Sequence, residues 1–226
     1  MKRKETFVGL DGYPGGWVAV WLSNDRQEIK YLPHIDELLP NDFAIAMIDI
    51  PIGLPDSGRR NCDIQARELL KPNQSRVFLD ARRGVLDCTS QPEASAKGKF
   101  LDGKGVSVQL FGIAKKLREM DAAITPALQN RLKECHPELV FWRLNKNKSV
   151  PTKKKGPGIE LRKRLLKREG ISQLESLLDS RIGQGAKIDD VLDACACALA
   201  ARDATAERPP LGGEEDARGL RMEIHY

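Results

Sequence analysis

The 226-residue sequence contains few aromatic residues and no long apolar run. Aromatic side chains make up 5% of the chain, too few to indicate a surface on which nucleic-acid bases stack. The longest uninterrupted apolar run, residues 194–201, is far shorter than the roughly 18–20 residues that cross a bilayer. The charged start of the chain also lacks the apolar core of a signal peptide. We therefore expect a soluble, cytoplasmic protein that does not bind membranes.

The five cysteines are odd in number and include no Cys-x-x-Cys pair. This usage favours reduced thiols over a disulfide framework. Cys195 and Cys197 would point to different faces of a helix, which excludes a zinc site there. Hydrophobic residues make up 41% of the chain, too many for a disordered protein. The length is that of one large domain, so we expect a single domain over residues 1–226.

Positive charge is concentrated in one segment. The net charge of the chain is +5, but residues 146–168 contain ten Lys or Arg residues and a single acid. A basic segment on an otherwise slightly acidic chain indicates a polyanionic partner, here DNA or RNA, although such charge runs are also common on solvated surfaces. We call this segment the basic arm. Its expected phosphate contacts are Lys153, Lys154, Lys155, Arg162, Lys163 and Arg164.

The order of apolar runs and turn signals predicts an α/β fold. Strands are expected at 7–11, 17–22, 28–32, 44–48 and 131–135, an edge strand at 222–225, and helices at 35–39, 62–70, 108–120, 137–144, 160–169 and 189–202. Residues 71–105 show no clear period, and residues 153–158 read as a loop. The first two strands can form a hairpin, whereas the strands separated by helices can pair in parallel. We expect a mixed five-stranded sheet with helices on both faces, an order that resembles the ribonuclease H-like fold.

Acidic residues stand at the ends of two predicted strands and at the start of the last helix. Asp11 and Asp49 end the strands, whereas Asp189, Asp190 and Asp193 open the helix at spacings that share a face. Ligands in α/β sheets bind at the carboxyl ends of strands, and clustered carboxylates repel one another without a cation. We therefore expect these acids to bind Mg²⁺ or Mn²⁺, which prefer oxygen ligands. The acids of the helix could instead cap it.

Further candidates surround the predicted strand at 131–135. Glu134 is a possible additional metal ligand, and His136 could position a phosphate or move a proton. Glu138 is a secondary candidate in the same group. The structural alternative is that His136 and Glu138 only begin a helix at Pro137, where an acid complements the helix dipole.

Four motifs occur in a characteristic order along the chain. They are VGLDG with a following GW at 8–17, IDIPIGLP at 48–55, ECHPE at 134–138 and DDVLDA at 189–194. Together they resemble the predicted ribonuclease H-like nucleases catalogued as domain of unknown function 429, over nearly the whole chain. The resemblance implies a ribonuclease H-like fold with a carboxylate cluster drawn from Asp11, Asp49 and the helix of Asp190 and Asp193.

The expected function is metal-dependent hydrolysis of nucleic-acid phosphodiester bonds. Asp11, Asp49, Asp190 and Asp193 would hold the metal that activates water, with Asp189 or Glu134 assisting. One alternative is an ATP-binding phosphotransferase of the actin-like group, with phosphate held by the glycine-rich turn at 12–16. The other is a non-catalytic nucleic-acid-binding protein on the same fold.

Overall fold

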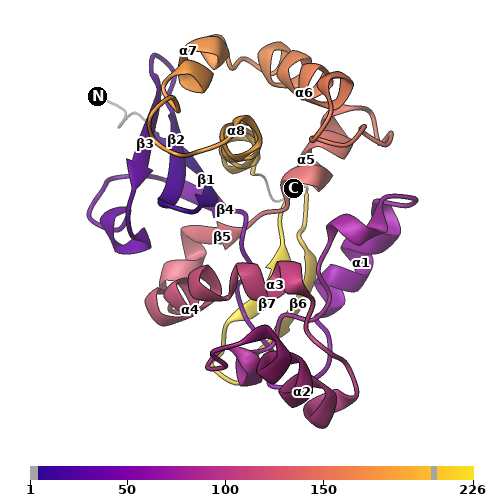
Figure 1. Ribbon diagram of the computed structural model, residues 1–226. Helices are drawn as coiled ribbons and strands as arrows, with labels where there is room; N and C mark the ends of the chain where they lie inside the picture. The colour runs from indigo at the N-terminus through magenta and orange to yellow at the C-terminus, as the bar shows by residue number, and fades with distance from the viewer. Residues whose placement is uncertain (1–4, 205–207) are drawn as a thin grey trace. The chain divides into compact units, whose positions relative to one another are not determined.

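The computed structural model describes residues 5–204 and 208–226, which form two compact units (Figure 1). Unit 1 contains the described parts of residues 1–49, 130–209 and 225–226, and unit 2 contains residues 50–129 and 210–224. The chain thus leaves unit 1 directly after Asp49. The single domain over residues 1–226 stays a prediction.

Unit 1 is built on a five-stranded sheet with the order β3-β2-β1-β4-β5 (Figure 1). Its strands are β1 Phe7–Tyr13, β2 Gly16–Leu22, β3 Gln27–Leu32, β4 Ile45–Ile48 and β5 Leu132–Glu134. β2 runs antiparallel to both β1 and β3, and β4 runs parallel to both β1 and β5. The predicted mixed sheet is confirmed, and its topology is consistent with a ribonuclease H-like architecture.

Side chains on both faces of this sheet are buried. In the interior strand β2, all seven residues are buried, as expected for a strand that is apolar on both sides. Val18 and Val20 point to one face and belong to the main hydrophobic core. Trp17 lies on the opposite face, because successive side chains alternate along a strand, and it is also fully buried.

Helix α8, Ile188–Arg202, packs against β1, β2 and β4. Its residues from Val191 to Ala201 are all buried, since the helix is surrounded by the sheet and by other helices. The remaining helices of unit 1 are α5 Pro137–Leu144, α6 Gly156–Arg168 and α7 Leu174–Asp179, and each contacts α8. The segment predicted at 35–39 as a helix forms the short 3₁₀ turn η1, Ile35–Glu37.

The start of α6 corrects the prediction of a loop over 153–158. The helix begins at Gly156 instead of near Glu160, because Pro157 occupies the first turn, where proline is favoured. Helix α7 was not predicted at all. All five cysteines are buried, and none forms a disulfide within the described part of the chain.

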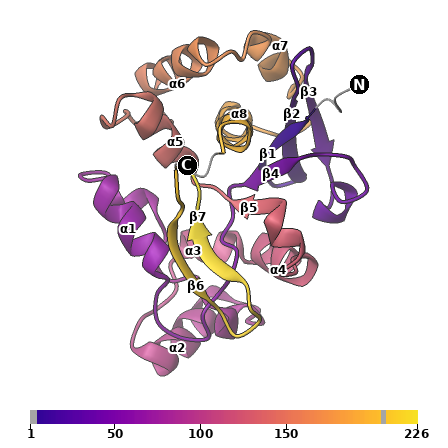
Figure 2. The same ribbon diagram turned by 180° about the vertical axis from the view of Figure 1, so that it is seen from behind.

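Unit 2 combines helices with a small hairpin (Figure 2). Its helices are α1 Asn61–Leu69, α2 Gln91–Asp102, α3 Val108–Gly112 and α4 Ala114–Ala123, and its 3₁₀ turns are η2 Gln74–Arg76 and η3 Arg83–Val85. Strands β6 Leu211–Glu215 and β7 Arg221–Ile224 pair antiparallel beside α1. A further 3₁₀ turn, η4, spans Leu128–Asn130. Across residues 5–204 and 208–226, no helix combines the length and apolar character that a membrane crossing requires.

Two predictions for unit 2 need correction, and a third is confirmed. The single helix expected at 108–120 is broken at Ile113, whose backbone (φ −100°, ψ 4°) is not helical, and the preceding Gly112 is a poor helix former. Helix α2 lies within the segment that showed no period, capped by Ser90 and ended by Gly103. The predicted tail strand is confirmed as β7, which pairs with β6, and His225 directly after it forms an isolated parallel bridge with Cys135.

Candidate metal-binding site

The parallel pairing of β1 and β4 brings Asp11 and Asp49 side by side. The backbone amide of Asp49 donates a hydrogen bond to the carbonyl of Leu10 at 2.9 Å, which continues the register of the two strands. Residues two apart in a strand share a face. Asp11 therefore lies on the face of Gly9, which touches α8, and Asp49 lies on the face of Met47, which packs in the same core.

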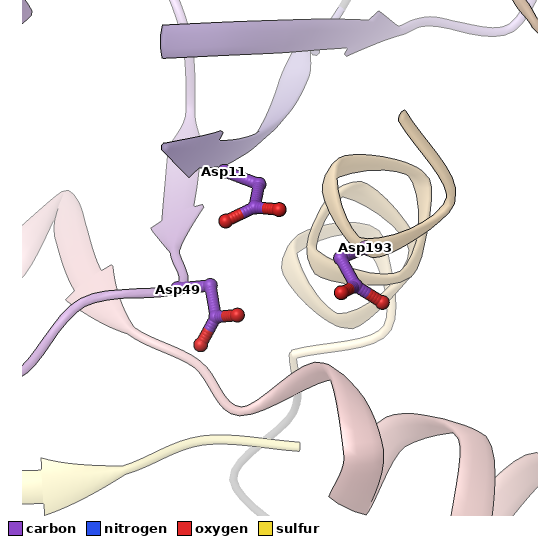
Figure 3. A group of neighbouring side chains, drawn as sticks. All are labelled: Asp11, Asp49 and Asp193. Atoms are coloured by element: carbon purple, nitrogen blue, oxygen red, sulfur yellow. The ribbon is translucent and has the colours of Figure 1, made fainter. Parts of the chain in front are cut away.

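Asp193 on α8 completes a group of three carboxylates, which we call the acidic cluster (Figure 3). One oxygen from each of Asp11, Asp49 and Asp193 lies within 4.8 Å of the other two. Asp11 and Asp193 are buried, whereas Asp49 is half-buried. The sequence predicted that these three residues lie together, and the structure brings them together at the carboxyl ends of β1 and β4.

The acidic cluster fits a hard divalent cation. Its donors are all carboxylate oxygens, which Mg²⁺ and Mn²⁺ prefer. One oxygen of Asp193, Oδ1, is buried and has no hydrogen-bond partner within the part of the chain that the structure describes. A buried, unpaired polar atom is unfavourable unless something satisfies it. A cation held by the three carboxylates would satisfy this oxygen.

Burial and mutual repulsion raise the pKa of all three carboxyl groups. Burial, followed by repulsion from Asp193, raises the pKa of Asp49 to about 7. The pKa of Asp11 is raised well above its usual value by burial and then by Asp49 and Asp193. Burial also raises the pKa of Asp193, although Lys153 opposes the shift. A divalent cation would favour the ionised carboxylates and so counteract these shifts.

A lysine of the basic arm lies at the acidic cluster. Lys153 Nζ is 2.5 Å from Asp193 Oδ2 and 3.8 Å from Asp189 Oδ2. Burial alone would lower the pKa of Lys153, but Asp193, Asp11 and Asp49 together raise it above its ordinary value, so the ammonium stays charged. The expected phosphate contact of Lys153 stays a prediction, and the structure places its ammonium beside Asp193. A run of lysines in the sequence does not show which of them folds inward.

The other predicted ligands lie outside the group of three among the residues described here. Asp190 Oδ2 accepts a hydrogen bond from the backbone amide of Lys187 at 2.7 Å, which caps α8. Asp189 is partly exposed, and its carboxylate lies 3.8 Å from the ammonium of Lys153. Glu134 ends β5 and is buried. The capping alternative for the acids that open the helix is therefore realised by Asp190.

His136 and Glu138 both belong to the start of α5. His136 is the N-cap residue, and its carbonyl accepts from the amides of Leu139 and Val140. The two carboxylate oxygens of Glu138 lie 2.7 and 2.8 Å from Nη2 of Arg162. Glu138 therefore binds a residue of the basic arm.

Arg162 is buried and holds the arm in place. Besides its contact with Glu138, its Nη1 donates to the carbonyls of Pro151 at 2.7 Å and Gly158 at 3.1 Å. Its side chain is fully buried, which corrects its assignment as a phosphate contact. A charged residue without exposure cannot reach a solvent-borne polyanion, and the charge pattern alone could not reveal this.

The other predicted phosphate contacts of the basic arm differ in their exposure to solvent. Lys163 is half-buried, and its Nζ lies 3.0 Å from the carboxylate of Glu175. Lys154, Lys155 and Arg164 are exposed. These three are the predicted phosphate contacts that the fold leaves open to solvent.

Fold and site together define an α/β protein with a mixed five-stranded sheet and three converging carboxylates. A family model described as "Protein of unknown function (DUF429)" matches residues 9–217, and the chain belongs to this family. The matched range contains all three residues of the acidic cluster. Comparison with curated proteins gave no match, and comparison with solved structures gave none either.

Proposed function

We propose that the protein is a divalent-metal-dependent nuclease that hydrolyses phosphodiester bonds of DNA or RNA. Asp11, Asp49 and Asp193 would hold Mg²⁺ or Mn²⁺. The observation that supports this most strongly is the convergence of three carboxylates within 4.8 Å, one of which has a buried oxygen without a hydrogen-bond partner among the described residues. When bound, the ion supplies positive charge that activates water and stabilises the leaving oxygen of a phosphodiester.

The chain itself contributes position and environment. Asp11 lies in β1, Asp49 directly follows the paired strand β4, and Asp193 lies in the buried helix α8, so backbone packing sets the spacing of the three carboxylates. Burial removes much of the surrounding water, which strengthens every electrostatic interaction at the site. Such preorganised groups are the usual means by which enzymes stabilise developing charge.

A nucleic-acid substrate is supported by the position of the basic arm. Lys153 ties the arm directly to Asp193 of the cluster. The exposed side chains of Lys154, Lys155 and Arg164 belong to the same arm, and cations of this kind bind a phosphate backbone without regard to base sequence. The arm can therefore hold a polyanion whose scissile bond reaches the acidic cluster.

A cleavage screen tests the proposal. Single- and double-stranded DNA, RNA, hybrids and branched junctions would be incubated with Mg²⁺, Mn²⁺ or EDTA, using wild type, Asp49→Asn and Asp193→Asn. We expect cleavage that requires metal and is abolished in both variants, with nucleic-acid binding retained. Asp179→Asn, which makes the same chemical change at an exposed position of α7, is the matched control and should cleave like wild type.

The same samples separate the alternatives. Binding of nucleic acid without metal-dependent cleavage of any substrate would favour the non-catalytic binding protein. Hydrolysis of ATP that exceeds nucleic-acid cleavage, and that is lost in Asp49→Asn, would favour the phosphotransferase. Cleavage that persists unchanged in both cluster variants would show that the activity does not arise at this site.

A further inference from the structure

The acidic cluster already contains a cation supplied by the chain itself. The ammonium of Lys153 lies 2.5 Å from Asp193 Oδ2, although the two residues are 40 positions apart in sequence. The side chain of Asp193 is 2% exposed and that of Lys153 is 32% exposed. Lys153 is thus an ion-pair partner that approaches a buried acid from the solvent side.

Hydrogen bonds from the buried side chain of Arg162 hold the loop that carries Lys153. Arg162 binds the carbonyl of Pro151 before the loop and that of Gly158 after it, while Glu138 binds Arg162. The fit at Gly158 is close, because a Cβ atom there would lie 2.0 Å from the carbonyl oxygen of Thr152. The position of Lys153 is therefore determined by buried contacts and not by a chance encounter of surface charges.

A single ammonium satisfies the acidic cluster incompletely. Lys153 engages Oδ2 of Asp193 but leaves Oδ1 of the same carboxylate without a partner within the described part of the chain. One positive charge also faces three carboxylates. A divalent ion bound by all three carboxylates would share Asp193 with Lys153 and would repel the ammonium at short range.

We propose that Lys153 is a built-in counter-cation, which stabilises the acidic cluster without metal and is displaced from Asp193 when a divalent ion binds. The inference rests on the metal site of the proposed function and adds a residue that sets its affinity. Metal has to compete with Lys153, so the lysine weakens metal binding. Displacement also returns the ammonium to the exposed side of the arm, next to Lys154 and Lys155.

The direct test measures Mn²⁺ affinity at pH 8 by electron paramagnetic resonance or calorimetry. Lys153→Met removes the charge and keeps the length of the side chain, and we expect it to bind Mn²⁺ at least about tenfold more tightly than wild type. Lys153→Arg, which keeps the charge, should stay close to wild type. Lys148→Met is the matched control, because Lys148 is an exposed lysine of the same arm, and its affinity should not change.

A second measurement follows Lys153 in the wild-type protein and does not depend on the folding of any variant. Amine acylation, read by mass spectrometry, should modify Lys153 more slowly than Lys154 in EDTA. Saturating Mn²⁺ should raise the rate at Lys153 toward that of Lys154. In parallel, Lys153→Met should lower the melting temperature in EDTA, because it leaves buried carboxylates without their partner.

Each outcome of these measurements either supports or overturns the proposed role of Lys153. Unchanged or weaker Mn²⁺ binding by Lys153→Met, or acylation of Lys153 that Mn²⁺ does not alter, would overturn it even if metal-dependent cleavage is observed. Tighter binding together with metal-induced acylation would support it even if no nucleic acid is cleaved, in which case only the proposed nuclease activity fails. If wild type and variant both fail to bind Mn²⁺, the counter-cation role and the metal site fall together.

Discussion

Gly9 of β1 and Ala198 of α8 are in direct backbone contact. A Cβ atom at Gly9 would lie 2.0 Å from the amide nitrogen of Ala198 and 2.1 Å from the carbonyl oxygen of Ala194. Only glycine permits this approach. It holds α8 against the strand whose next residue on the same face is Asp11, and thereby holds Asp193 close to Asp11.

We therefore predict that Gly9→Ala separates α8 from β1. The added methyl group meets backbone atoms that cannot rotate away, so the free energy of unfolding should fall by about 3 kcal/mol, the upper end of the usual cost of overpacking. Mn²⁺ affinity should fall as well, because the spacing of the acidic cluster changes. Urea denaturation and metal titration measure the two effects.

Gly112→Ala is the control for that substitution. Gly112 lies in helix α3 with nothing within 4 Å of an added Cβ. Alanine there should leave stability unchanged or raise it by about 0.5–1 kcal/mol, because alanine favours helix. Equal stability of the two glycine variants would contradict the importance of the contact between β1 and α8.

The effects of substituting Arg162 and Glu138 on the free energy of unfolding should be strongly coupled. Removing the guanidinium in Arg162→Met leaves the buried carboxylate of Glu138 without its partner, and we expect a loss of about 3–5 kcal/mol in the free energy of unfolding. The double variant Arg162→Met/Glu138→Leu should recover part of that loss, since it leaves no unpaired charge. A double-mutant cycle by urea denaturation measures the coupling, and additive single effects would show that the pair is unimportant.

The metal-free protein should lose stability as the pH rises from 5 to 7. The pKa of Asp49 is about 7 in the folded protein and about 3.9 in an unfolded chain. In this interval the folded state holds more protons than the unfolded state. The free energy of unfolding therefore falls with rising pH, by up to about 1.4 kcal/mol per pH unit for each additional proton.

The check is a series of urea denaturation curves in EDTA between pH 5 and 7. Asp193 and Glu138 raise the pKa of Asp49, Lys153 lowers it, and Asp11 lies beside it in the acidic cluster. Asp49→Asn removes the titrating group and should flatten the dependence. A stability that rises with pH, or a slope that is the same in the variant, would contradict the raised pKa.

The exposed residues of the basic arm should determine the salt dependence of nucleic-acid binding. Replacing Lys154, Lys155 and Arg164 with Ala should lower the slope of log K against log salt by about 2–3, since each phosphate contact contributes about 0.7–0.9. The loss should be similar for all base sequences. Fluorescence anisotropy at several salt concentrations measures it, and an unchanged slope would make the arm an ordinary solvated surface.

Much of unit 1 could be predicted from local patterns. The apolar runs at β2 and β4 and the long apolar helix α8 are recognisable because their side chains are buried on every side. Asp11, Asp49 and Asp193 were predictable as a group, since each acid lies beside an apolar segment. A charge in such a place is unfavourable unless a partner or a metal ion satisfies it. The parallel pairing of β1 with β4 is then sufficient to bring Asp11 and Asp49 together.

The features that could not be predicted depend on contacts between residues that are distant in sequence. Whether Asp190 or Asp193 joins the cluster depends on the rotation of α8 about its axis, which the backbone contact at Gly9 decides. Asp190 and Asp193 are three residues apart in the helix, so the sequence was compatible with either residue joining the cluster. Likewise, β7 pairs with β6 because of the hairpin, a relationship that the composition of the tail did not indicate.

The sequence by itself determined the five strands of the larger sheet, the last helix, the family, and Asp11 and Asp49 as converging acids, because these follow from local burial patterns and motif order. Only the tertiary structure decided the roles within the basic arm. Lys153 turns inward to Asp193 and Arg162 is buried against Glu138, whereas Lys154 stays in solvent. The physical reason is that a charge is recognisable in a sequence, but the partner that satisfies it is selected by packing across 24 to 40 residues of intervening chain.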